Sequence, residues 1–402
     1  MATLIILGSA ILISFLGGKG VSRLCLPMVV GYVLAGVVLG KSFLKIVTPS
    51  EVAQVSLLND IALGIIAFLI GSELSFSRLK TLGKSIVVIA IFESLGAFVL
   101  VSLSVYIFVH KVYVALILGA VASATAPAAT VAVINEMKSR GPLTTTVLGV
   151  VGSDDAIALM IYAFASSWAK SFFYHKSLSW RSLLLVPFRE ILTAVAVGVG
   201  IGFILGFLVR KVKTRTESFA LAIGFFLLAE GLAVQLHVSE LLLVMSLAIT
   251  ASNLSPRRIN SVSENITLLG FPLVAAFFCL AGTKLDISLL PRVGMIGLIY
   301  LLSRIFGKYL GASMGAAVSG APAVVRKYIG FSLWPQIGVA VALAVVVERE
   351  FGHLGIAGKN LAEMAVNILL FTTVFTEILG PLATKLSLEK AGEINKFKPG
   401  GK

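Results

Sequence analysis

Apolar residues follow one another in long runs along most of this chain, and short polar stretches separate these runs. A run of about 20 apolar residues lets a helix cross the roughly 30 Å hydrocarbon layer of a bilayer. We count thirteen such segments, and the shorter ones indicate tilted or broken helices. They lie at residues 2–17, 26–40, 52–71, 84–109, 113–136, 143–166, 185–209, 216–234, 238–252, 263–282, 291–318, 323–348 and 360–386.

Composition supports this interpretation of the hydrophobic pattern. Hydrophobic residues make up 58% of the 402 residues and charged residues only 13%, whereas soluble domains contain about 25% charged residues. Mean hydropathy is +1.01. We therefore predict an all-α polytopic membrane protein with about thirteen transmembrane helices. The net charge of +14 comes from basic residues scattered over short loops, which is typical of cytoplasmic loops and does not indicate a nucleic-acid partner.

Cysteine and histidine residues give no sign of a metal centre or of a disulfide framework. The two cysteines lie beside or within apolar segments, and the four histidines are isolated near segment ends. Neither set has the spacing of a metal site. We therefore expect no cofactor and no resident metal. These residues are Cys25, Cys279, His110, His175, His237 and His353.

The distribution of Lys and Arg predicts the orientation in the membrane. Odd-numbered loops and the C-terminal tail carry more of these residues than the even-numbered loops do. The positive-inside rule then places the N-terminus outside and the C-terminus in the cytoplasm. The residues on the predicted cytoplasmic side are Lys19, Arg23, Arg78, Lys80, Lys84, Lys138, Arg140, Arg210, Lys211, Lys213, Arg215, Arg257, Arg258, Arg326, Lys327, Lys385, Lys390, Lys396, Lys398 and Lys402.

Two short motifs recur at nearly the same separation along the chain. Residues 127–133 (PAATVAV) correspond to 335–341 (PQIGVAV), and 71–74 (GSEL) correspond to 282–285 (GTKL). Segments 1–6 and 8–13 are therefore candidate repeats with segment seven as a linker. Because seven segments separate equivalent positions, the two copies have opposite topology. Inverted repeats of this kind are typical of secondary transporters.

Asp154 and Asp155 lie near the middle of the sixth segment. One ionisable group at that depth costs about 2.5–3.5 kcal/mol on insertion scales, and such residues usually serve transport. This pair is the first candidate for an ion site; a structural network of carboxylates is the alternative.

The fifth and twelfth segments each contain a proline at similar depth. A proline removes a backbone donor and leaves carbonyl groups of the preceding turn free. Two interrupted helices at corresponding places predict a midplane ion site, although two proline kinks without a site are the alternative. The hydroxyls of Thr125 and Thr130 add further acceptors. The residues concerned are Thr125, Pro127, Thr130, Pro335, Gln336 and Gly338.

Arg304 and Lys308 lie four residues apart within the eleventh segment, on one helix face. A lysine at that depth needs a partner, and we expect Asp154 to provide it; snorkelling of Lys308 to the cytoplasmic interface is the alternative. Glu377 is the candidate to neutralise Arg304. Other acids within apolar runs, which we rank below Glu377, are Glu93, Glu230 and Glu363.

Several motifs spread over nearly the whole chain carry a family resemblance. They are 27–36 (PMVVGYVLAG), 68–74 (FLIGSEL), the Asp154–Asp155 pair, 277–282 (FFCLAG), 304–308 (RIFGK), 335–340 (PQIGVA) and 376–381 (TEILGP). With them, the chain resembles the bacterial and archaeal monovalent cation:proton antiporters of the Kef/Nap-type branch.

The resemblance implies a core domain with two crossed, unwound helices and a scaffold domain that forms a homodimer. The implied division is 1–83 for scaffold helices 1–3 and 84–166 for core helices 4–6, with 113–136 as the first unwound helix. It continues with 167–290 for linker helix 7 and scaffold helices 8–10. Residues 291–388 form core helices 11–13, with 323–348 as the second unwound helix, and 389–402 form a cytoplasmic tail.

The resemblance also implies a function and residue roles. It predicts a secondary antiporter, not an enzyme, that exchanges Na⁺, or Li⁺ or K⁺, for H⁺ across the cell membrane by alternating access. Asp155 would bind the cation or a proton, Asp154 would pair with Lys308, and Asp154 and Thr130 would complete the Na⁺ ligands. The Asp-Asp pair resembles electrogenic exchangers. The expected partners are monovalent cations, protons, membrane lipid and a second copy of the chain.

Two features depart from the family pattern. Ser153 stands where relatives often have an apolar residue, and the chain stops at Lys402 without the nucleotide-binding domain of many potassium exporters.

Other functions are alternatives to sodium/proton exchange. A K⁺-selective efflux system or a cation channel is the main alternative, although a channel predicts a continuous polar pore. Cation-dependent symport of an organic anion would need a larger polar cavity.

Overall fold

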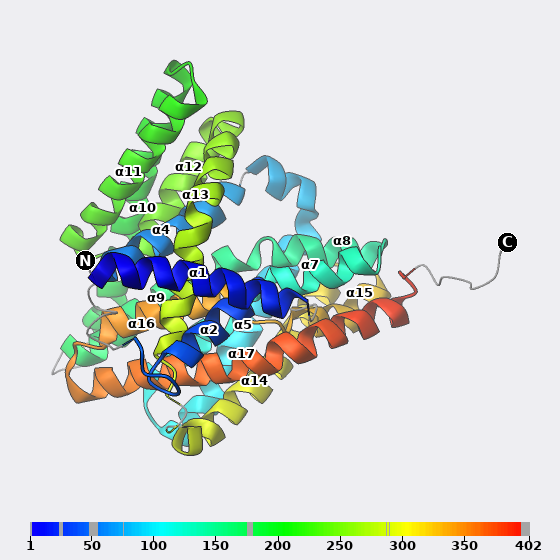
Figure 1. The fold of residues 1–402 in the computed structure, drawn as a ribbon. Coiled ribbons are helices and arrows are strands. Elements are labelled where there is room, and N and C mark those ends of the chain that lie inside the picture. Colours follow the sequence, from blue (N-terminus) through cyan, green and yellow to red (C-terminus); the bar gives the residue numbers. More distant parts are fainter. Residues whose placement is uncertain are drawn as a thin grey trace.

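The computed structural model describes residues 2–23, 27–47, 55–74, 76–174, 180–286, 288 and 290–394. All regular structure within these ranges is helical, and no strand occurs there (Figure 1). The prediction of an all-α fold is confirmed. Cys25, His175 and the tail beyond residue 394 lie outside the described residues.

The helices account for most of the predicted apolar segments. Nine of them in the described residues are long and apolar enough to cross a membrane, or ten if one bent helix pair counts as a single span. Their bounds are α1 Ala2–Ser22, α2 Met28–Leu39, α4 Ser56–Glu73, α5 Phe76–Val109, α6 Val112–Ala122, α7 Pro127–Glu136, α8 Pro142–Val151, α9 Asp154–Tyr174, α10 Trp180–Lys211, α11 Arg215–Leu236, α12 Glu240–Leu254, α13 Pro256–Thr283, α14 Leu290–Val318, α15 Ala323–Tyr328, the 3₁₀ helix η2 Ile329–Leu333, α16 Gly338–Phe351 and α17 Gly355–Ala391.

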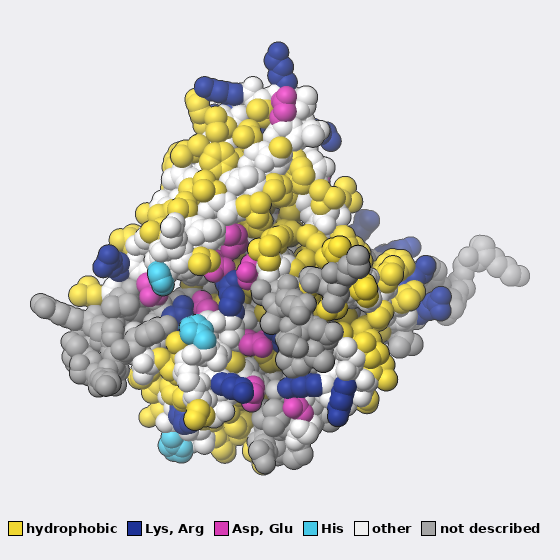
Figure 2. All heavy atoms as spheres, turned by 60° about the vertical axis from the view of Figure 1, so that its left-hand side comes forward, with side chains coloured by type: hydrophobic (Ala, Val, Ile, Leu, Met, Phe, Trp, Pro, Cys, Tyr) yellow, Lys and Arg dark blue, Asp and Glu magenta, His cyan; other side chains and the backbone are white. Residues whose placement is uncertain are grey.

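Figure 1 shows two neighbouring groups of helices. Helices α10 to α13 rise together and pack with α4, while α13 also packs against α1 and α2. In the other group, α5 packs along α14, and α17 packs against α14, α16 and η2. Figure 2 shows hydrophobic side chains over much of one face, with acidic and basic side chains near its middle and lower part. Such an apolar exterior is suited to contact with lipid.

Two predicted segments are interrupted near the positions that proline indicated. The fifth consists of α6 and α7, with residues 123–126 between them, and Pro127 occupies the first turn of α7. Proline is favoured there because the first turn needs no backbone donor. The twelfth is divided at residues 334–337, between η2 and α16, and bends by 49°.

The sixth predicted segment differs from the expectation of one continuous helix. It is divided into α8 and α9 at Gly152 and Ser153, so Asp154 and Asp155 lie in the first turn of α9. The Ser153 hydroxyl donates a hydrogen bond to the Gly149 carbonyl at 2.9 Å. Serine side chains that bond to the backbone in this way compete with helix continuation, and glycine adds backbone freedom. The aspartate pair therefore lies at a helix break.

The end of the chain that follows α17 caps the start of α8. The Glu393 carboxylate accepts hydrogen bonds from the backbone N–H groups of Leu143 and Thr144, both at 2.7 Å. It also accepts one from the Thr144 hydroxyl at 2.7 Å. A carboxylate at a helix N-terminus satisfies unpaired donors and matches the positive end of the helix dipole. Glu393 therefore ties the predicted tail to the helix that leads to the aspartate pair.

We predict that Glu393→Gln destabilises the protein, because the neutral amide offers one acceptor oxygen in place of two and no charge for the helix dipole. The loss should be about 1 kcal/mol, which corresponds to a decrease in Tm of roughly 1–3 °C for a chain of this size. Thermal unfolding of the detergent-solubilised protein measures it. Glu389→Gln is the matched control, because Glu389 is exposed. Equal Tm values for the two variants would contradict the cap.

Candidate functional site

Arg304 of α14 joins the two interrupted helices. Its guanidinium is fully buried and donates hydrogen bonds to the carbonyls of Ala122 at 3.0 Å and Ala124 at 2.8 Å, at the end of α6. It donates others to the carbonyls of Trp334 at 2.6 Å and Pro335 at 3.4 Å, between η2 and α16. A helix end leaves carbonyls unpaired and carries negative partial charge. The N–H donors of the Arg304 guanidinium therefore satisfy unpaired carbonyl groups at both helix breaks at once.

Direct contacts between the two breaks complete the crossing. The Ala126 backbone N–H donates to the Pro335 carbonyl at 2.9 Å. The Gln336 side-chain amide donates to the Val121 carbonyl and to the Tyr300 hydroxyl, both at 2.9 Å. The Thr130 hydroxyl donates to the Ser332 carbonyl at 2.9 Å. These bonds hold the two unwound stretches in a fixed relation inside the protein.

Lys308 lies one helical turn beyond Arg304 and is also fully buried. Its ammonium lies 2.5 Å from the Glu93 carboxylate and donates to the Thr125 hydroxyl at 2.7 Å and to the Ser123 carbonyl. The nearest oxygen of Asp154 is 3.9 Å away. Because Lys308 is enclosed by these partners, the snorkelling alternative does not hold. The predicted pairing with Asp154 exists only as the longer of two ion pairs.

Close packing of α5 against α14 brings Glu93 to Lys308. A Cβ atom at Gly307 would meet Gly96 and Ala97, and one at Gly311 would meet Phe92 and the Glu93 backbone. Any larger residue would push the two helices apart. The glycines therefore allow a buried carboxylate on α5 and a buried ammonium on α14 to form a direct ion pair.

The aspartate pair has carboxylate oxygens without hydrogen-bond partners. Asp154 is fully buried, and neither of its oxygens accepts a hydrogen bond from the described part of the chain. Asp155 is only partly buried, and its Oδ1 also has no partner there. Unpaired buried polar atoms are costly unless water, an ion or a proton satisfies them. The pair is thus the part of this cluster that is chemically available.

Glu377 is positioned differently from the sequence-based expectation. It is fully buried on α17, and among the described residues its carboxylate oxygens have no hydrogen-bond partner and no ion pair with Arg304. The Arg304 donors are directed to backbone carbonyls instead. Thr373, one turn earlier on α17, donates to the Gln336 carbonyl at 2.9 Å. Glu377 therefore lies on a helix that supports the second break.

The six residues predicted for the interrupted helices occupy distinct positions. Thr125 and Gln336 lie between helical segments, and each hydrogen bonds within the crossing. Pro335 lies there too and accepts hydrogen bonds through its carbonyl. Pro127 and Thr130 belong to α7, and Gly338 begins α16. The Thr130 hydroxyl contacts Ser332.

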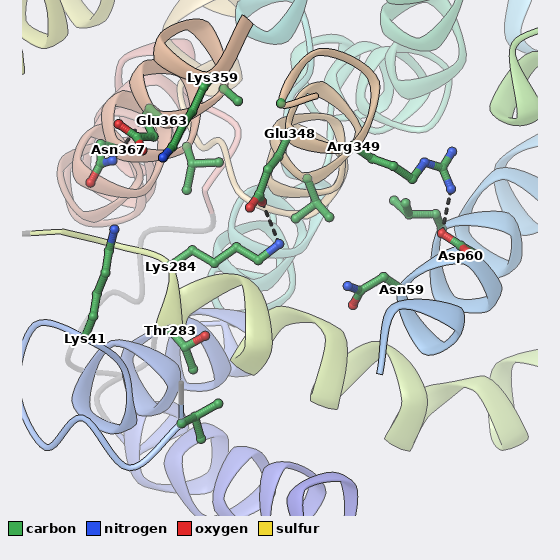
Figure 3. A pocket seen from close by; sticks show the side chains of 16 residues that line it. Lys41, Asn59, Asp60, Thr283, Lys284, Glu348, Arg349, Lys359, Glu363 and Asn367 are labelled. Atoms are coloured by element: carbon green, nitrogen blue, oxygen red, sulfur yellow. Dashed lines mark hydrogen bonds and ion pairs between the residues drawn. The ribbon is translucent and has the colours of Figure 1, made fainter. Parts of the chain in front are cut away.

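A cavity of about 580 Å³ lies beyond the other end of α16, away from the aspartate pair. Figure 3 shows that it is bordered by charged side chains from several helices. Lys284, after α13, pairs with Glu348 of α16 at 2.6 Å, and Arg349 of α16 pairs with Asp60 of α4 and Glu240 of α12, both at 2.6 Å. These ion pairs connect the helix that begins at the crossing with three helices of the neighbouring group.

Asp286 belongs to the same edge of the protein. Its carboxylate accepts a hydrogen bond from the Ser288 hydroxyl at 2.5 Å and lies 3.3 Å from the Lys41 ammonium. These contacts lower the pKa of Asp286, the Ser288 hydrogen bond being the largest cause. This partly buried carboxylate therefore stays charged near neutral pH.

Sequence reasoning ranked Glu93 below Glu377 and gave no role to Arg349, which borders the cavity. Glu93 is an isolated acid in an apolar run, and the amino-acid sequence does not show with which cation it forms an ion pair. The one available signal was the run of glycines in segment eleven, which allows another helix to approach closely. Arg349 sits in a predicted loop at the end of segment twelve, where a solvent-exposed charge is expected by default.

Chemically, the arrangement provides two buried cations, Arg304 and Lys308, and the three carboxylates of Glu93, Asp154 and Asp155. No group of three His, Cys, Asp or Glu side chains in the described ranges is arranged to hold a resident metal. The aspartate pair can accept a proton or a monovalent cation. Carboxylate and hydroxyl oxygens are ligands that hard cations prefer.

Comparisons with solved structures show the same fold. The structure of the sodium proton antiporter MjNhaP1 from Methanocaldococcus jannaschii at pH 8 superposes with a TM-score of 0.79 and 19% sequence identity. That match covers 97% of this chain and 99% of MjNhaP1. The electron-microscopy structure of MjNhaP1 superposes with a TM-score of 0.74, also at 19% identity, and covers 98% of both chains. No curated protein sequence matches this chain.

A family model provides the assignment. The model of the transmembrane sodium/hydrogen exchangers matches residues 9–390, which is nearly the whole chain. The chain therefore belongs to the transmembrane sodium/hydrogen exchanger family.

Proposed function

We propose that this protein exchanges Na⁺ for H⁺ across the cell membrane at the Asp154–Asp155 pair. The observation that carries the proposal is a pair of carboxylates with unpartnered oxygens at a helix break, beside two buried cations. The family assignment and the likeness to MjNhaP1, described as a sodium proton antiporter, support the same reaction. Asp155 is the exchanging carboxylate, because it is the less buried of the two.

Exchange follows from competition for one site. A carboxylate that holds a proton is neutral and a poor cation ligand, whereas the ionised form attracts Na⁺. Asp154 adds a second negative group, and the Thr130 hydroxyl is the candidate third ligand. Two carboxylates and Lys308 can hold more than one exchangeable proton, which permits the movement of net charge in each cycle, and we propose that the exchange is electrogenic. Because these groups interact, their pH midpoint belongs to the cluster.

We further propose that the site alternates between the two faces by movement of a core against a scaffold. The core comprises residues 84–166 and 291–388, and the scaffold comprises 1–83 and 167–290. Packing of α5 along α14, and of α13 with α2 and α4, supports this division. In the described part of the chain, the ion pairs of Arg349 and Lys284 join the two parts at one end. Movement there would require those pairs to separate.

The proposal also covers the branch of the family, the oligomeric state and the orientation in the membrane. The Asp154–Asp155 pair with Lys308 favours the Kef/Nap-type branch. We infer a homodimer formed by the scaffold, no cofactor and no enzymatic activity. Basic residues in alternate loops support an external N-terminus and a cytoplasmic C-terminus. The cavity beside Lys284 and Lys359 then faces outward.

We predict that Asp155→Asn abolishes exchange but leaves the yield of folded protein nearly unchanged. An amide cannot alternate between a proton and a cation, and it relieves a buried charge. The measurement is Na⁺-driven proton flux in proteoliposomes containing a pH dye. The control Glu389→Gln also replaces a carboxylate by an amide, but at an exposed position, and it should transport like the wild type. Full Na⁺-dependent proton flux in Asp155→Asn would refute the site.

Orientation gives an independent prediction. In a protein without Cys25 and Cys279, a single cysteine at Lys359→Cys should react with a membrane-impermeant thiol reagent added to intact cells. A cysteine at Lys213→Cys should react only after the cells are permeabilised, because residues 210–215 lie in a predicted cytoplasmic loop. Both lysines are exposed. The reverse pattern would overturn the proposed orientation.

The ion pairs at the cavity predict an effect on access from outside. Arg349→Gln removes the pairs with Asp60 and Glu240, and two partly exposed pairs contribute about 1 kcal/mol together. Labelling of Val345→Cys, which lines the cavity, should then be about fivefold faster from outside. Lys359→Gln is the control, because Lys359 lines the same cavity and forms no ion pair with the described residues. Equal labelling rates in the two variants would show that Arg349 does not restrict opening.

A further inference from the structure

Three acceptors use the three donors of the Lys308 ammonium. They are the Glu93 carboxylate at 2.5 Å, the Thr125 hydroxyl at 2.7 Å and the Ser123 carbonyl. A lysine ammonium has three N–H bonds. No donor is left for Asp154, whose nearest oxygen is 3.9 Å away. This explains why neither Asp154 oxygen accepts a hydrogen bond from the described residues although a cation lies beside it.

Glu93 is itself fully satisfied. One carboxylate oxygen faces Lys308, and the other accepts a hydrogen bond from the Ser94 hydroxyl at 2.9 Å. The side chains of Glu93 and Lys308 are both 0% exposed. A buried and hydrogen-bonded ion pair of this kind keeps a fixed geometry, because separating it would leave two unpaired charges. The pair of Glu93 and Lys308 is therefore the more rigid of the two ion pairs.

We propose that Glu93 is a positioning residue that holds Lys308 and thereby leaves Asp154 free to bind the transported cation. The inference rests on the proposed exchange at the aspartate pair and names the group that sets the affinity of that site. Glu93 touches neither the cation nor Asp155; it acts through Lys308. Without the negative charge of Glu93, Lys308 is drawn to Asp154, the other carboxylate beside it, and a cation must then break that new contact to use the same oxygen.

The test compares Na⁺ affinity among variants. Glu93→Gln should raise the KM for Na⁺ in proteoliposomes about tenfold, the effect of one charge-assisted hydrogen bond formed in competition. The kcat at saturating Na⁺ should stay within about twofold. Glu93→Asp keeps the negative charge and should restore most of the affinity. Ser94→Ala, which removes only the neutral hydrogen bond to the other oxygen, should change KM by less than about twofold.

A second measurement shows whether Glu93 acts through Lys308. Direct binding of radioactive Na⁺ to purified protein reports affinity even in variants that do not transport. In a Lys308→Gln background, Glu93→Gln should cause no further loss of binding, because residues that act through one partner are not additive. A KM for Glu93→Gln equal to that of the wild type, or a full additional loss in the Lys308→Gln background, would overturn the inference.

These outcomes are separable from failure of the proposed function. If the wild-type protein shows no coupled Na⁺ and H⁺ movement, the exchange itself is refuted. If the wild type exchanges and Glu93→Gln binds Na⁺ as tightly, only the positioning role is refuted. A variant with a low yield of folded protein and equal losses in KM and kcat indicates a structural role for Glu93, which also contradicts the inference.

Discussion

The structure depends on two buried cations on one face of α14, placed against backbone that is not helical. Arg304 has no ion pair in the described residues, and four carbonyls at two helix breaks accept its hydrogen bonds. Irregular backbone inside a membrane is tolerated only where its polar groups are satisfied. The breaks and the arginine therefore require each other. One turn further along, Lys308 makes the same kind of contact with Ser123 and adds the ion pair with Glu93.

This crossing places the proposed exchange site, Asp154 and Asp155, beside groups whose hydrogen bonds are already made. Glu93, Lys308 and Arg304 have their hydrogen-bonding capacity largely filled, whereas Asp154 and Asp155 have not. A cation or a proton can occupy the second set without dismantling the first. Helix α16 begins at the crossing, and Glu348 and Arg349 in its last turn form ion pairs with the neighbouring group of helices. A rigid helix thus connects the site to the contacts that must change if access alternates.

Much of this arrangement could be predicted from the sequence because its signals are local. Charged residues in apolar runs identified Asp154, Asp155, Arg304 and Lys308, and prolines located both breaks within a few residues. The pairing of Lys308 with Glu93 could not be predicted, because it depends on how closely α5 and α14 approach. The break at Gly152 was missed because hydrophobicity continues through it, although Ser153 turns its hydroxyl to the backbone. The cap by Glu393 joins residues 250 positions apart, which no periodicity reveals.

The central claim is that one cluster carries Na⁺ and H⁺ in alternation, so neither ion moves without the other. Proteoliposomes loaded with radioactive sodium and a pH dye, with the membrane voltage clamped by an ionophore, test this most directly. The account predicts that sodium leaves only as protons enter, and that sodium release slows when the external pH rises and protons become scarce. Sodium release that continues at the same rate without proton uptake would contradict it, since that is the behaviour of a channel.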